Sequence, residues 1–365
     1  MFKYMQVKQR ILLDVEKLKP HEKIMSRPMM CKKFGFARTT VDAAINELIE
    51  EKILYSIVGS GTYVSDQRVV KQIDNPDVSS WGIVLPNLVE DIFPQFVRGI
   101  EDYSQTINTN TVICNTDNSI SKQDEYFRRL VDSGVSGLIV VPAISREQGE
   151  GGFEIVRKAG LPIVFCSRTV SSFIDAPLVY SNDFYGGYIA TKHLLRAGYR
   201  RIAYIARELY QSSRERYAGY FAALAEENIE INRSFIYLEP LRRSDGDNYY
   251  SNDDSYYFMQ KLLELPDHPD AFFCFNDRVG AQAYRAVRQA GFAVSDDIGV
   301  VSYDDTGICD VIEPKLSSVN FGGFEMGNKA AAILHKSIEG GHLEGTNVYV
   351  IQPKLTVRDS CLGPK

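Results

Sequence analysis

The stretch ARTTVDAAINELIEEKILYSIVGSGTYVS, residues 37–65, decides how the first part of the chain folds. After Thr39 and Thr40, apolar residues recur at the i, i+3, i+4, i+7 spacing of one buried helical face, which predicts a helix opening at these threonines. Two β-prone runs, 53–57 and 62–64, follow and flank the turn VGSG. A helix followed by such a β-wing fits a groove of DNA. The apolar positions of the helix are Val41, Ala44, Ile45, Leu48 and Ile49.

Two further helices are expected before that stretch. The first spans Tyr4–Leu18 and ends at the break Lys-Pro-His-Glu of residues 19–22. Ser26 is placed to cap a second, short helix that carries a proline in its first turn and stops at Gly35. Three helices and a wing predict a winged helix-turn-helix domain over residues 1–65.

Charge is divided unevenly between this head and the remainder. The 365 residues hold 41 Lys and Arg against 47 Asp and Glu, a formal net charge of -6. Residues 1–70 hold 12 basic and 8 acidic residues, a net of +4, which leaves the other residues with 29 against 39, a net of -10. A basic head on an acidic body is the asymmetry expected when only the head meets phosphate.

The head resembles the GntR family of bacterial regulators. The pieces KFGFARTTV, residues 33–41, and GSGTYV, residues 59–64, follow that family's pattern F-G-[apolar]-S-R-x-T-V and G-x-G-T-[FY]-V. In the family, the arginine before the recognition helix, the first turn of that helix and the wing glycines touch DNA. The resemblance therefore implies a DNA-contact set of Arg38, Thr39, Thr40, Gly59, Ser60 and Gly61. Hydroxyls and an arginine at a helix N-terminus suit phosphates and base edges.

Three positions depart from the GntR pattern. Ala37 replaces the usual serine, and Asp42 stands where a basic residue is common. A carboxylate at that position would repel phosphate or read a cytosine amino group. The second helix begins Met-Ser-Arg-Pro instead of Pro-Ser-Glu-Arg, so we expect Arg27 to take over a phosphate contact. These differences predict an altered operator preference. The alternative reading of the head is a winged helix used for protein contacts.

The remainder reads as a polar linker, residues 66–80, followed by an α/β body, residues 81–365. Apolar strand runs alternate with amphipathic helices, which predicts parallel sheets. The runs fall into two series, which suggests two similar lobes. A ligand between them would lie at the carboxyl ends of the strands. The expected strands are 82–85, 111–114, 137–141 and 163–165, then 201–205, 235–238, 271–274 and 298–301.

Four segments of the body resemble, in family order, the LacI/GalR regulators and the periplasmic sugar-binding proteins. They are WGIVLP (81–86) with its neighbours to residue 101, NDFYGG (182–187) with its neighbours to residue 202, RYAGY (216–220), and FND (275–277) with VSYDD (301–305) and LSSV (316–319). The resemblance implies a two-lobed, type I periplasmic-binding-protein-like fold.

The same resemblance implies a set of effector contacts. Arg216 and Asp277 are expected to hold sugar hydroxyls, because a guanidinium gives paired hydrogen bonds and a carboxylate accepts from two hydroxyls. Phe93 is placed to stack on a sugar face. Asn182 and Asp183 lie in a crossover region that often reaches the ligand, and Tyr250 is a looser aromatic candidate. Two alternatives stay open: Asp277 as a helix cap and Phe93 as a core residue. The pair Asp304 and Asp305 is assigned to the hinge.

Several classes of protein find no support in the sequence. The six cysteines form no C-x-x-C pair and lie mostly in apolar runs, which indicates reduced, buried thiols and no metal site. No nucleophile-elbow, zinc-protease or P-loop motif occurs, so we expect no catalysis and no cofactor. A signal peptide and a run of about 18 apolar residues are also missing, which predicts a cytoplasmic protein without a membrane partner.

These observations lead to one hypothesis and three rivals. The hypothesis is a cytoplasmic, homodimeric transcriptional regulator, a repressor of a carbohydrate operon, that binds double-stranded operator DNA under control of a small sugar between the lobes. One rival keeps the architecture with a purine or nucleoside effector, and a second is a solute-binding protein. The third, an aminotransferase-like enzyme, lacks a recognisable Schiff-base lysine motif.

Overall fold

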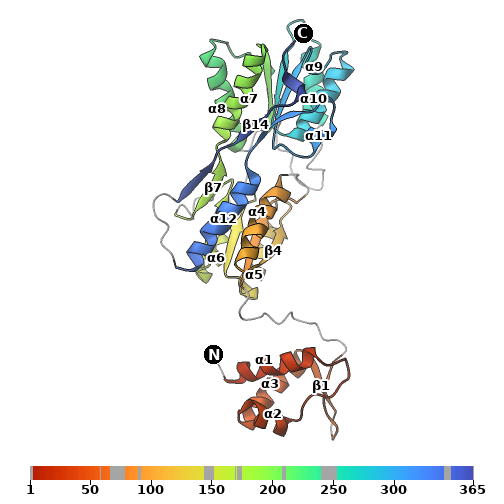
Figure 1. Ribbon diagram of the computed structural model, residues 1–365, viewed down its shortest axis with the longest axis vertical. Coiled ribbons are helices and arrows are strands. Elements are labelled where there is room, and N and C mark those ends of the chain that lie inside the picture. Colours follow the sequence, from red (N-terminus) through yellow and green to blue (C-terminus); the bar gives the residue numbers. More distant parts are fainter. Residues whose placement is uncertain are drawn as a thin grey trace. The chain divides into compact units, whose positions relative to one another are not determined.

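The computed structural model divides the chain into two compact units, Met1–Val78 and Ser79–Lys365 (Figure 1). We call the first unit the head and the second the body. The structure describes residues 3–57, 59–65, 79–88, 92–143, 152–168, 170, 175–207, 211–239, 253–340 and 347–364. Most of the predicted linker therefore lies outside the described residues.

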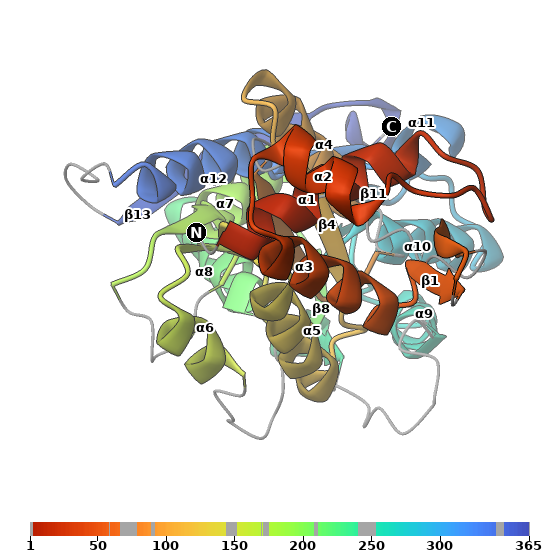
Figure 2. The same cartoon turned by 90° about the horizontal axis from the view of Figure 1, so that it is seen from below.

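The described part of the head contains three helices and an antiparallel pair of strands, α1 (Lys3–Glu16), α2 (Arg27–Phe34), α3 (Arg38–Glu50), β1 (Leu54–Ile57) and β2 (Gly61–Val64). Figure 2, in which the head is red, shows its helices packed together. The predicted buried face of α3 is confirmed, because Val41, Ala44, Ile45 and Leu48 are all buried in the core of the head. The helix begins at Arg38, one residue before the expected threonines.

Local backbone conformation explains where the short helix α2 ends. Gly35 ends α2 in the left-handed region, with φ of 75°, which glycine adopts without the penalty of a Cβ. Ser26 occupies the N-cap position, but its side chain makes no cap hydrogen bond. The segment before α2 pairs with the wing, since Ile24 donates its N–H to Thr62 and Val64 donates to Glu22. Lys23 thus lies beside β2, where it forms an isolated antiparallel β-bridge with Tyr63.

The described strands of the body form two six-stranded sheets, and every pair of neighbouring strands among them is parallel except β12 with β14. The first sheet has the order β13-β7-β6-β5-β3-β4, and the second has the order β14-β12-β11-β10-β8-β9. Central strands such as β5, β6 and β10 are buried at every residue, as parallel strands covered on both faces should be. The strand bounds are β3 Ser80–Leu85, β4 Asn110–Asn115, β5 Gly137–Val140, β6 Ile163–Cys166, β7 Leu178–Ser181, β8 Ile202–Arg207, β9 Ile236–Glu239, β10 Ala271–Cys274, β11 Gly299–Tyr303, β12 Ser317–Asn320, β13 Val348–Ile351 and β14 Lys354–Thr356.

Helices cover both faces of each sheet. Side chains of α4 and α12 pack into the core on one face of the first sheet, and side chains of α5 and α6 pack on the other face. The second sheet repeats this arrangement with α7 and α8 on one face and α9 and α10 on the other. The bounds are α4 Phe93–Thr106, α5 Ile120–Ser133, α6 Phe153–Ala159, α7 Asp183–Ala197, α8 Gln211–Glu226, α9 Asp253–Leu263, α10 Asp277–Gln289, α11 Ile308–Val311 and α12 Gly323–Ile338.

The chain passes between the two lobes three times. It leaves the first sheet after β7, returns after β12 to form α12 and β13, and leaves again to form β14 (Figure 1). The two lobes are therefore interleaved in sequence, which the two series of strand runs did not reveal. The predicted α/β architecture with parallel sheets in two lobes is confirmed.

Candidate functional site

A cavity of about 110 Å³ lies between the two lobes of the body. A single water molecule needs roughly 10–15 Å³, so this space accommodates a small ligand. Its walls come mainly from residues that follow the carboxyl ends of strands in both sheets, where ligands of open parallel sheets bind. Asn87 follows β3, Ser167 and Arg168 follow β6, Asn276 follows β10, and Asp304 follows β11.

Arg216 of α8 is the buried cation of this cavity, with only 6% of its surface exposed. Its Nε lies 2.7 Å from Oδ1 of Asp183, and its Nη1 donates to the carbonyl of Phe275 at 2.8 Å. The guanidinium carbon lies 3.4 Å from the centroid of the Tyr303 ring, so the planar group is stacked as well as paired. Burial alone would lower the pKa of Arg216, but the Asp183 carboxylate raises it, and the cation is held.

Two glycines bring this ion pair together. A Cβ on Gly187 of α7 would lie 2.1 Å from the carbonyl oxygen of Arg216, and one on Gly219 of α8 would lie 2.0 Å from the carbonyl oxygen of Phe184. Helices α7 and α8 can cross at this distance only because neither glycine has a side chain. The crossing places Asp183, in the first turn of α7, beside Arg216.

The helices of the first lobe form an apolar wall. Phe93 and Phe96 of α4 and Met326 of α12 line the cavity, and all three are buried in one hydrophobic core. Phe93 is therefore both a core residue and a cavity residue, so the two readings of this position are compatible. Phe321, from the segment between β12 and α12, adds a further aromatic side chain.

Polar groups complete the cavity. Arg168 is anchored by its Nε, which donates to the carbonyl of Pro142 at 2.7 Å. Asn276 caps α10 by accepting the N–H of Val279 at 2.9 Å. Asp304 has φ of 100°, a backbone conformation that non-glycine residues adopt rarely and that often marks functional positions. These side chains supply hydrogen-bond donors and acceptors around an aromatic interior.

Comparisons with known proteins agree on what the body is. The sequence pattern of the family described as "Periplasmic binding protein-like domain" matches residues 191–361. A LacI family transcriptional regulator from Enterococcus faecium, solved with bound ribose, superposes with a TM-score of 0.65 at 27% identity, over 79% of this chain and 100% of that one. The body therefore has the two-lobed, parallel-sheet fold of a periplasmic-binding-protein-like domain.

Two relatives that align over most of this chain are named as repressors. The "Arabinose metabolism transcriptional repressor" of Geobacillus stearothermophilus is 29% identical over 98% of this chain and 97% of its own length. The "Ribose operon repressor" of Haemophilus influenzae is 26% identical over 87% of this chain and 90% of its own. These relatives are regulators, not enzymes.

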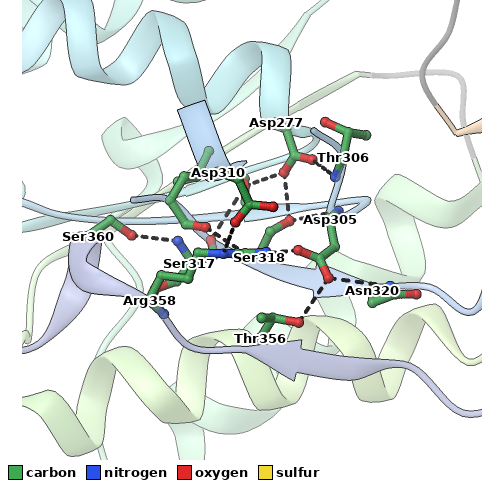
Figure 3. Close-up of polar contacts among 12 residues, drawn as sticks. Asp277, Asp305, Thr306, Asp310, Ser317, Ser318, Asn320, Thr356, Arg358 and Ser360 are labelled. Carbon is green, nitrogen blue, oxygen red and sulfur yellow. Dashed lines mark hydrogen bonds and ion pairs between the residues drawn. The ribbon is translucent and has the colours of Figure 1, made fainter. Parts of the chain in front are cut away.

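Asp277 is expected from the sequence to hold sugar hydroxyls, and the structure places it elsewhere. Asp277 does not line the cavity and is 1% exposed. Its Oδ1 accepts from the hydroxyl of Ser302 at 2.5 Å. The same oxygen accepts from the hydroxyl of Ser318 at 2.6 Å, and Oδ2 accepts from the N–H of Thr306 at 2.7 Å (Figure 3). Burial raises the pKa of Asp277, while these hydrogen bonds oppose the shift. Its role in the structure is to hold the loop after β11, and Asn276 takes the place in the cavity.

The same loop is held by a second carboxylate. Asp305 binds Nη1 of Arg358 at 2.8 Å through Oδ1, and its Oδ2 accepts from Thr356 at 2.9 Å (Figure 3). The side-chain amide of Asn320, the last residue of β12, also lies 3.3 Å from that oxygen. The loop that carries Asp304 into the cavity is thus attached to β12 and to β14. The chain leaves this lobe after β12 and re-enters it at β14. The predicted hinge assignment suits Asp305, whereas Asp304 lines the cavity.

Of the other predicted effector contacts, some line the cavity and others do not. Phe93, Asp183 and Arg216 all line the cavity. Asn182 does not, because its Oδ1 accepts the N–H of Tyr185 as the cap of α7, and its amide donates to Gln352 at 3.3 Å. Tyr250 lies outside the described residues.

Sequence reasoning missed several cavity residues that a single rule would have found. Asn87, Ser167, Arg168, Asn276 and Asp304 each come within two residues of the carboxyl end of a strand. The rule that ligands lie at those ends identifies all of them once the strand boundaries are known.

In the head, the predicted DNA contacts lie on exposed or partly exposed positions. Arg38 is the first residue of α3, and 75% of its side chain is exposed. Thr39 is exposed and Thr40 partly so. In the wing, Gly59 and Gly61 have φ of 76° and 141°, where a Cβ would be strained, and Ser60 lies between them.

Arg27 is less free than the sequence suggested. Its Nε binds Oδ1 of Asp42 at 2.8 Å, and its Nη1 donates to Oγ1 of Thr62 at 3.1 Å.

Among the described residues, no group of His, Cys, Asp and Glu is arranged to hold a metal ion. A search of the same residues finds no helix long and apolar enough to span a membrane.

Proposed function

We propose that this chain is a DNA-binding transcriptional regulator, a repressor of a carbohydrate-utilisation operon, whose operator binding is controlled by a small sugar. In this proposal residues 1–65 bind DNA, residues 66–80 link, and residues 81–365 bind the effector and pair two subunits. The observation that carries the proposal is the ion pair of the buried Arg216 with Asp183, whose guanidinium lies over the Tyr303 ring in a cavity between two lobes.

The charge of the cavity favours a neutral polyol. Its charged lining residues are two arginines and two aspartates, Arg168, Arg216, Asp183 and Asp304. Arg216 and Asp183 neutralise each other at 2.7 Å, and the remaining pair is balanced. A phosphorylated ligand would bring two negative charges without matching cations. Aromatic and amide side chains suit the apolar faces and hydroxyls of a pentose or deoxyhexose.

The head is proposed to be a winged helix-turn-helix of GntR type. The antiparallel pair β1–β2, and the pairing of residues 22–24 with β2, support a wing. Arg38, Thr39 and Thr40 open α3 on exposed positions, where the helix N-terminus and the arginine suit phosphates and base edges. A homodimer would present two heads to a near-palindromic operator in the cytoplasm.

Thermal denaturation with a ligand panel tests the effector half. The panel is L-arabinose, D-ribose, D-xylose, L-rhamnose, ribose 5-phosphate and hypoxanthine. We expect one neutral sugar to raise Tm, since a ligand at 100 times its Kd stabilises by about 2.7 kcal/mol. Arg216→Met should abolish that rise, whereas Arg214→Met, on the exposed side of the same helix, should keep it. A rise only with hypoxanthine would establish the purine alternative, and a rise only with the phosphate would refute the neutral-ligand argument.

Operator selection tests the DNA half. Binding of the full chain to a random duplex pool, followed by sequencing, should enrich a near-palindrome. Arg38→Ala should weaken binding to the enriched site at least tenfold, while Arg98→Ala, an exposed arginine of the body, should not. The effector found above should change operator affinity, because coupling between two sites is reciprocal. A chain that binds a sugar but enriches no sequence would be a solute-binding protein.

A further inference from the structure

Asp42 joins three elements of the head. It lies in the second turn of α3, with 37% of its side chain exposed. Its Oδ1 binds Nε of Arg27, the first residue of α2, at 2.8 Å, and its Oδ2 lies 3.7 Å from Nε of Arg38. Arg27 continues to the wing, where its Nη1 donates to Thr62 of β2 at 3.1 Å. One carboxylate thus faces two of the arginines proposed to contact DNA.

This arrangement argues against both sequence-based roles for Asp42. A carboxylate that reads a cytosine amino group needs an oxygen directed at the base edge, but both oxygens of Asp42 face guanidinium groups. Repulsion of phosphate alone does not describe the role of Asp42 either, because two cationic side chains lie beside its carboxylate. The Asp42–Arg27–Arg38 cluster carries a net charge of about +1 rather than +2.

We propose that Asp42 is a positioning residue that sets the selectivity of DNA binding: it holds Arg27 and Arg38 in place and lowers affinity for DNA of arbitrary sequence. The proposal rests on the proposed DNA-binding function of the head. An internal carboxylate competes with phosphate for the two guanidiniums, so a phosphate gains less from each of them. An operator that matches the fixed positions of both arginines recovers that loss, whereas random DNA does not.

The salt dependence of binding distinguishes this role from a structural one. The logarithm of the binding constant falls with the logarithm of salt concentration with a slope of about -0.9 for each phosphate neutralised. Removing the carboxylate frees cationic charge equivalent to about one phosphate contact. Asp42→Asn should therefore steepen the slope for random DNA by roughly 0.9 and raise the affinity several-fold. A loss of packing alone would weaken binding without steepening the slope.

The experiment measures fluorescence anisotropy of a labelled random-sequence duplex with the full-length protein between 50 and 200 mM KCl. Asp42→Asn is compared with Asp14→Asn, a matched control that also removes one negative charge from an ion pair of the head, here with Lys33 at 2.8 Å. Asp42→Glu keeps the carboxylate and should retain the wild-type slope. Circular dichroism confirms that each variant is folded.

The outcomes separate the two proposals. A steeper slope and at least threefold tighter binding for Asp42→Asn, with a smaller change for Asp14→Asn, supports the role of Asp42. Equal changes in the two variants would show that only the net charge of the head matters, and would overturn it. Unchanged or weaker binding by Asp42→Asn would overturn it too. If the wild type binds no DNA at any salt concentration, the proposed function itself fails, and this inference fails with it.

Discussion

The two lobes of the body use the same packing device to present opposite chemistry. In the first lobe, a Cβ on Gly99 of α4 would lie 2.1 Å from the carbonyl oxygen of Phe324, and one on Gly327 of α12 would lie 2.0 Å from that of Phe96. In the second lobe, Gly187 and Gly219 meet the partner helix at the same distances. The first pair of helices presents aromatic and thioether side chains to the cavity, and the second presents an ion pair. The glycines fix where the helices lie, and the residues beside them decide what the cavity recognises.

The ion pair should give the largest effect on stability. In Asp183→Asn, Arg216 would keep its charge in a buried site without its partner, and breaking a buried pair from one side costs roughly 3–5 kcal/mol. Urea denaturation should show a loss near the lower limit, because the carbonyl of Phe275 and the Tyr303 ring still contact the guanidinium. Asp175→Asn, at an exposed position, should leave the midpoint unchanged. A loss below about 1 kcal/mol would mean that water or another group compensates Arg216.

The glycine crossings should come next. Gly187→Ala and Gly99→Ala each place a methyl group against a backbone carbonyl, so both should destabilise the fold by about 1–3 kcal/mol. Only Gly187→Ala should also lower the affinity for the effector found in the panel by more than tenfold, because the crossing of α7 and α8 positions Arg216 directly. Gly307→Ala is the matched control, since nothing lies within 4 Å of its Cβ and its φ is -57°. An equal loss of affinity in Gly187→Ala and Gly99→Ala would contradict the proposed difference between the two lobes.

The apolar wall should contribute less. Phe93→Leu keeps most of the buried volume, so its cost in stability should be about 1 kcal/mol. The aromatic face is lost, and sugar binding measured by calorimetry should weaken about tenfold. Phe221→Leu, at a position 52% exposed on α8, should change neither quantity. An unchanged affinity for Phe93→Leu would show that the aromatic face of Phe93 takes no part in recognition.

The smallest effect is expected at Arg358. Its guanidinium binds Asp305, Asp310 at 3.1 Å and the carbonyl of Leu316, and a lysine ammonium cannot make all three contacts. Arg358→Lys should cost about 0.5–1 kcal/mol in thermal denaturation and weaken sugar binding a few-fold, through the loop that carries Asp304. Arg233→Lys, on an exposed position, provides the control. Full affinity in Arg358→Lys would show that Asp304 is held without the Arg358–Asp305 pair.

Periodicity and composition predicted most of the architecture but failed at single-residue turns. The expected strands of both series occur close to their predicted positions. The error between Asn276 and Asp277 has a local cause. Asn276 still has extended backbone, with φ of -148°, and Asp277 is the first residue of the helix, so adjacent side chains point to different places. No periodicity shows where that change occurs.

Non-local contacts were also beyond the sequence. Asp304 lines the cavity through a left-handed backbone conformation that its residue type does not require. The contact of Asp42 with Arg27 joins residues from two different helices, so a residue that looked like a departure from a pattern is part of an ion cluster. Arg27, the partner of Asp42, lies outside the window in which the motif is read.

The interleaved sheets constrain the order in which this protein can fold on the ribosome. Helix α12 and strand β13 complete the lobe that begins at residue 80, so about 270 residues separate its first and last elements. The other lobe needs β14, beyond residue 350, at the edge of its sheet. Neither lobe can finish while the last elements are still inside the exit tunnel, whereas the head has all its described elements by residue 64. Nascent chains should therefore carry a folded head long before either lobe is complete, and pulse proteolysis of stalled chains would detect this sequence of events.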